Sequence, residues 1–115
     1  MAQDFERVAA SSISNTQTPA GATTLWTSNS DDALIGINAA NKGTSQILVT
    51  FLVTDADNTP FYYILKDAPV PVGSALQVLD GGAKVVLQSG DILKAYADTA
   101  SACDVWISVV DTISS

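Results

Sequence analysis

The chain has 115 residues, 47% of them hydrophobic and only 15% charged. This length corresponds to a single domain that can bury a core without disulfide bonds. The net charge is −7, and the five bases are scattered singly along the chain, at Arg7, Lys42, Lys66, Lys84 and Lys94. Because phosphate groups and anionic lipids attract clustered cations, nucleic acid and membranes are disfavoured as partners, and we expect neither.

Short segments rich in β-branched and aromatic residues recur every 8–12 residues, with turn-forming residues between them, and no stretch shows a sustained helical period. The predicted strands are residues 5–13, 22–27, 33–41, 46–54, 61–65, 75–79, 84–88, 92–97 and 104–113. This spacing predicts an all-β protein, specifically a single antiparallel β-sandwich of about eight to nine short strands with jelly-roll-like connections. Residues 1–15 are predicted to form an N-terminal strand or arm, and residues 16–115 the sandwich domain.

Alternation of side chains along the strands predicts which faces are buried. Residues 46–54 are apolar at both odd and even positions, so we expect a central strand that is covered on both faces. In residues 33–41, strict alternation would place Leu34, Gly36 and Asn38 on the face opposite Ile35 and Ile37.

Turn chemistry predicts the connections. Residues 55–60, rich in Asp and Asn, should join two antiparallel strands, and Asp80-Gly81-Gly82 should form a tight hairpin between residues 75–79 and 84–88. Pro69, Pro71 and Gly73 are expected to end the strand that begins at Phe61, because proline cannot donate to a ladder. The connections at residues 15–21 and 66–74 are long enough to cross between sheets.

Enzymatic chemistry is not expected. The chain has no histidine and carries none of the common nucleophile, phosphate-loop or dinucleotide motifs. We therefore predict no catalytic residues and no cofactor.

Two acidic segments are candidate metal sites. Asp55-Ala56-Asp57-Asn58-Thr59 places oxygen ligands at alternate positions, but the glycine and the closing glutamate of a calcium loop are missing, so a turn is preferred. Asp31-Asp32 is similarly interpreted as a solvated loop rather than as a contact patch or metal corner. No metal is predicted.

Cys103 is the only cysteine, so it cannot form an internal disulfide, and we expect a buried or half-buried strand residue whose thiol is not activated by neighbouring Asp104. The acidic start of the chain lacks the apolar segment of a secretory signal, and no apolar run is long enough to span a bilayer. We therefore expect a soluble protein made in the cytoplasm.

Five aromatic residues are candidate interface residues: Trp26, Phe61, Tyr62, Tyr63 and Trp106. Tryptophan and tyrosine anchor protein interfaces, but they also fill β cores and stack on sugars. Since residues 61–63 are consecutive, alternation sends Tyr62 to the face opposite its two neighbours. We favour a subunit interface over core filling alone, and both over carbohydrate binding.

Five segments together resemble small structural proteins of tailed phages, including marine cyanophages: residues 18–27, 35–41, 62–65, 66–76 and 87–93. The resemblance covers residues 17 to about 110 and consists of turn and strand punctuation, including Pro71-Val72-Gly73-Ser74 and Ser89-Gly90-Asp91. It implies a β-sandwich that forms multimers or decorates a larger assembly, and it transfers no catalytic residue.

The resemblance leads to the expectation of a non-enzymatic virion protein, most specifically an oligomeric capsid decoration (cement) protein on the phage head. Its expected partners are copies of itself and the major capsid protein. A tail, neck or fibre-associated protein, with tail or neck proteins as partners, is the first alternative. A carbohydrate-binding adhesin module is the second.

Overall fold

A computed structural model describes residues 4–18, 20–55, 61–78 and 85–111, and these contain nine strands but no helix. Five strands form one sheet (sheet A), and four form a second sheet (sheet B). The strands are β1 (Asp4–Ala10), β2 (Thr23–Thr27), β3 (Asp32–Asn41), β4 (Ile47–Thr54), β5 (Phe61–Val70), β6 (Ala75–Gln77), β7 (Val85–Leu87), β8 (Ile92–Ala97) and β9 (Cys103–Asp111).

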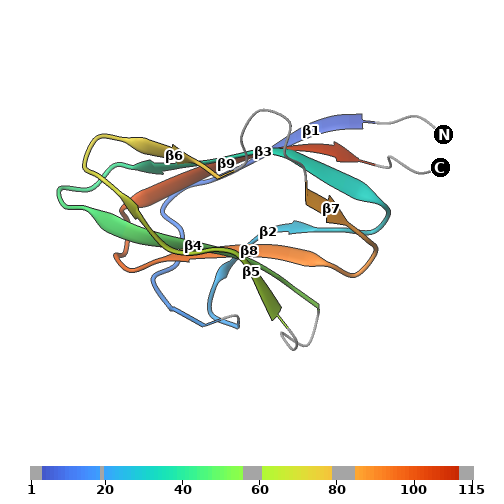
Figure 1. Cartoon of the computed structure of the whole chain (residues 1–115), viewed down its shortest axis with the longest axis horizontal. Helices are drawn as coiled ribbons and strands as arrows, with labels where there is room; N and C mark the ends of the chain where they lie inside the picture. Colours follow the sequence, from blue (N-terminus) through green and yellow to red (C-terminus); the bar gives the residue numbers. More distant parts are fainter. Residues whose placement is uncertain (1–3, 19, 56–60, 79–84, 112–115) are drawn as a thin grey trace.

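The two sheets lie one above the other, so the protein is a β-sandwich (Figure 1). Sheet A has the order β1-β9-β3-β6, with β7 also pairing with β3, and sheet B has the order β2-β8-β4-β5. All the pairings are antiparallel. Strands adjacent in sequence repeatedly lie in opposite sheets, which is the connectivity of a jelly roll. The predicted fold class is therefore confirmed.

Strand β4 lies between β8 and β5 in sheet B, and most of its residues are buried. Val49 and Phe51 point into the sandwich and are fully buried, while Thr50 and Leu52 on the other face are fully buried as well. The prediction of a central strand covered on both faces is confirmed. In sheet A the matching inner side chains include Leu34, Ile107 and Val109.

The predicted alternation in β3 is wrong. A register shift between Leu34 and Gly36 inserts a residue opposite β9, so that Leu34 and Ile37 both reach the core while Ile35 is exposed. Such a bulge reverses the facing of every residue beyond it relative to strict alternation. The small and β-branched residues of this segment give no sign of the bulge in the sequence.

Two predicted connections are also wrong. Strand β5 ends at Val70, directly before Pro71 as predicted, but it continues through Pro69, which it can do because β5 is an edge strand and Pro69 needs no second partner. Strands β6 and β7 do not form a hairpin, because they run in the same direction along β3, opposite its residues 38–40 and 32–34. The predicted turn at residues 80–82 lies outside the described residues.

Asp32 at the start of β3 is fully buried, so the prediction of a solvated loop does not hold for this residue. Its carboxylate accepts hydrogen bonds from the Trp26 indole N–H at 3.0 Å and from the Ser30 hydroxyl at 2.8 Å, and the Ser28 hydroxyl lies 2.7 Å away. Burial of a carboxylate is costly unless it is hydrogen-bonded in this way. The network joins β2 to β3 across the two sheets.

Candidate interaction surface

The outer face of sheet A is the candidate interaction surface, and the strand registers arrange its side chains in rows across the sheet. One row consists of Phe5, Val110, Ala33 and Val86, and the next consists of Arg7, Ser108 and Gly36. Two further rows are Ala9, Trp106, Asn38 and Gln77, and then Asp104, Ala40 and Ala75. Directly opposed residues share a face, so all of these side chains point away from the core.

Large apolar side chains on this face remain open to solvent. Phe5 is 78% exposed, Val86 59% and Trp106 49%, and Ile35 is exposed beside them. The Arg7 guanidinium carbon lies 5.1 Å from the centroid of the Trp106 ring, a cation–π distance. Arg7 therefore covers part of the indole.

Three shallow hollows surround these side chains. The first, of about 280 Å³, lies between Ala9, Ala40 and Trp106. The second and third, each of about 310 Å³, lie beside Trp106 and Ser108 and between Phe5 and Ile35. A continuous exposed apolar patch is characteristic of protein interaction sites, whereas apolar residues exposed singly are common on any protein surface.

The other predicted aromatics lie elsewhere. The rings of Phe61 and Tyr63 on edge strand β5 make an edge-to-face contact at 5.5 Å, and the Lys66 ammonium lies 5.2 Å from the Tyr63 ring. Tyr62 is 66% exposed and borders a separate hollow next to Asp55 and Asp91. The structure thus brings Phe61 and Tyr63 together but places Trp106 in the other sheet.

Trp26 is only partly exposed, and its indole N–H is bound to buried Asp32. Its ring packs against the core, so it joins the two sheets. Sequence reasoning missed Phe5, Ile35 and Val86 as exposed apolar residues. The sequence signal for Phe5 was in β1, where Phe5, Arg7 and Ala9 share one face and Arg7 is the one charged residue among them.

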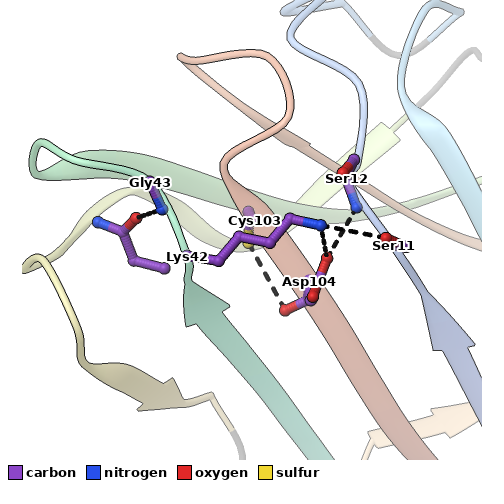
Figure 2. Close-up of polar contacts among 7 residues, drawn as sticks. Ser11, Ser12, Lys42, Gly43, Cys103 and Asp104 are labelled. Carbon is purple, nitrogen blue, oxygen red and sulfur yellow. Dashed lines mark hydrogen bonds and ion pairs between the residues drawn. The ribbon is translucent and has the colours of Figure 1, made fainter.

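A polar cluster fixes the end of sheet A next to this surface (Figure 2). The Lys42 ammonium lies 2.7 Å from an Asp104 carboxylate oxygen and donates to the Ser11 hydroxyl at 3.1 Å. The same carboxylate oxygen accepts the Ser12 backbone N–H at 2.9 Å. The hydrogen bond from Lys42, together with that from Ser12, lowers the pKa of Asp104. These contacts connect the ends of β1, β3 and β9.

Cys103 lies beside this cluster and is fully buried, as the sequence predicted. Burial, and to a lesser degree the neighbouring Asp104 carboxylate, raises the pKa of the Cys103 thiol to about 11. The thiol is therefore protonated at neutral pH, which is the unreactive form.

Within the described ranges, no group of three or more histidine, cysteine, aspartate or glutamate side chains is placed to hold a metal ion. The candidate calcium segment lies outside them from residue 56 onward. The same part of the chain contains no helix long and apolar enough to cross a membrane. Comparisons with protein-family models and with curated proteins found no match to this chain.

Proposed function

We propose that this chain is a non-enzymatic structural protein of a tailed-phage particle, and specifically a decoration protein that docks on the outside of the capsid. The observation that carries the proposal is the open apolar outer face of sheet A around Trp106. A monomer that leaves such a face in water is suited to an assembly that covers it.

The fold supports the proposal by analogy, because jelly rolls recur in viral capsid proteins. The sequence resemblance to phage structural proteins points in the same direction. The apolar composition with few charges suits a protein that is made in the host cytoplasm and then buried against neighbours in the virion. A tail or neck location would equally leave this face to be covered by a neighbouring subunit.

The test is the copy number of the chain in purified virions, measured by quantitative mass spectrometry against the major capsid protein. We expect a number on the scale of the capsid protein. A number that matches a single ring or a few fibres would move the protein to the neck or tail. Absence from the particle would contradict the virion role.

Carbohydrate binding is the second candidate, because jelly rolls also occur in lectins and the hollow beside Trp106 is lined by Asn38, Gln77 and Ser108. Amide and hydroxyl groups next to an indole suit a sugar ring. Against it, Arg7 already lies over the Trp106 ring. Titration of the chain with host surface polysaccharide tests it, since a lectin would lose binding in Trp106→Ala but keep it in Tyr62→Ala.

A further inference from the structure

We propose that the outer face of sheet A binds the same face of a second copy of the chain, about a two-fold axis parallel to the strands. This inference deepens the proposed function by naming one partner and its docking surface. It rests on that function for its biological purpose but not for its geometry.

The distribution of charge favours a second copy. The chain has a net charge of −7, so two copies repel each other over most of their surfaces. Among the described outward side chains of sheet A, charge is confined to Arg7 and to Asp104 at one end, where Lys42 pairs with it. Glu6 alternates to the other side of β1, although it also borders the hollow between Phe5 and Ile35. This face is therefore one through which two identical acidic chains can approach with little repulsion.

The size of the face also fits. The molecule measures 45 × 30 × 20 Å, and the strands run along its longest dimension while the sheets are stacked across the intermediate one (Figure 1). The ten residues of β3, the longest strand of sheet A, span about 33 Å, so the face of this sheet has an outline of about 33 by 20 Å. A standard stable interface covers about 800 Å² of each partner. Full contact between two such faces is of that order.

Arg7 determines the direction of the axis. An axis across the strands would place β1 over β1 of the second copy and bring the two Arg7 side chains together, which is unfavourable. An axis parallel to the strands instead places β1 over β6 and β7 of the second copy. Because Phe5 and Val86 end the same row on opposite edges of the sheet, each Phe5 then meets Val86 of the other copy.

The test introduces opposite charges on the two sides of this contact. Phe5 and Val86 are both exposed, so Phe5→Glu and Val86→Lys empty no core space. Within one molecule the two positions are three strand spacings apart, about 14 Å, too far for direct pairing. Sedimentation equilibrium is measured for the wild-type chain, both single variants, the double variant and Thr24→Glu, a control at an exposed strand position in sheet B.

We expect the wild-type chain to dimerise with a Kd below about 0.1 mM, and each single variant to weaken dimerisation at least tenfold. The double variant should recover most of this loss, and Thr24→Glu should have little effect. Dimerisation should also strengthen as ionic strength rises from about 0.01 M to 0.15 M, because salt screens the repulsion between acidic copies. Melting curves verify that each variant is folded.

A chain that stays monomeric at about 0.1 mM would overturn the inference, as would single variants that dimerise normally or a double variant without recovery. If the monomer binds purified capsids and Phe5→Glu abolishes that binding, the face belongs to the capsid contact instead. These outcomes leave the virion copy number untouched. Conversely, absence from virions with intact dimerisation would contradict only the proposed function.

Discussion

Both outer faces of the sandwich are formed by strands whose side chains alternate between the two sides of a sheet, yet only one of these faces is covered by the chain itself. On sheet B, Leu52 is fully buried and Tyr96 is 5% exposed, although both point away from the space between the sheets. On sheet A, Trp106 in the corresponding outward orientation is 49% exposed. The difference lies in the connections that pass over each face.

Sheet B receives its cover from two neighbouring segments. The connection from β1 to β2 brings Ala22 against Leu52 and Tyr96. Strand β5 then bends at Asp67, whose φ is 51°, and the Asp67 N–H donates to the Thr50 hydroxyl at 3.0 Å. Sheet A has three hollows instead of such a cover within the part of the chain described. One outer face is therefore covered by the chain itself, and the other is open to solvent.

The largest expected effect is on the covered face. Leu52→Ala should lower the free energy of unfolding by about 2–5 kcal/mol, because it leaves a cavity where no solvent can enter. Urea unfolding measures the loss, with Ile35→Ala on the open face as the matched control, expected to cost about 1 kcal/mol or less. Equal losses for the two variants would mean that the outer faces do not differ in stability.

Trp106→Ala should cost only about 1–1.5 kcal/mol of folding stability, since half of the side chain is already in water. A fully buried tryptophan would cost about 3–5 kcal/mol. The same variant should lose dimerisation in sedimentation experiments, whereas Tyr62→Ala should keep it. A core-sized loss of stability would argue that Trp106 serves folding rather than assembly.

Sequence reasoning predicts the sandwich well because its signals are local. The largely apolar strand β4 and the alternation of Val105, Ile107 and Val109 with Trp106 both follow from the two-residue period of side chains along a strand. The bulge in β3 could not be predicted, since an extra residue changes which side faces the core without changing composition.

The candidate interaction surface on sheet A is harder to predict because it combines segments that are distant in the sequence. Phe5 and Val86 lie at the two ends of one row across sheet A, but they are 81 positions apart in the sequence. Alternation also assigns Leu52 and Trp106 alike to outer faces. Whether an outer face is covered depends on the path of the loops, and that information is tertiary.

Tyr96→Phe tests the polar seal of sheet B. Burial is the main cause that raises the pKa of Tyr96, whose hydroxyl also interacts with Thr50 and Tyr63. Removing it should cost about 0.5–1.5 kcal/mol at neutral pH. Because the folded pKa is raised, wild-type stability should fall as pH rises above the ordinary tyrosine value of 10.0, and the variant should lose this part of the decline. Urea titrations at neutral and alkaline pH measure both effects.

The smallest effect is expected at the polar cluster beside the open face. Lys42→Ala removes a largely exposed ion pair and should cost about 0.2–1 kcal/mol. The lowered pKa of Asp104 means that this contribution is present above the ordinary carboxyl value of 3.8 and disappears as pH falls through the folded pKa. The melting temperatures of the wild-type chain and Lys42→Ala should therefore converge at acid pH. Lys42→Arg keeps the positive charge, so at neutral pH it should melt at a higher temperature than Lys42→Ala.

Lys42→Ala should also expose Cys103 to thiol reagents more often, because the ion pair between Lys42 and Asp104 holds together the strand ends next to Cys103. The labelling rate at constant pH measures this opening directly. Faster labelling with unchanged dimerisation would show that the cluster secures the edge of sheet A without forming part of its docking surface. Loss of dimerisation in Lys42→Ala would instead extend the docking surface to the end of the sheet.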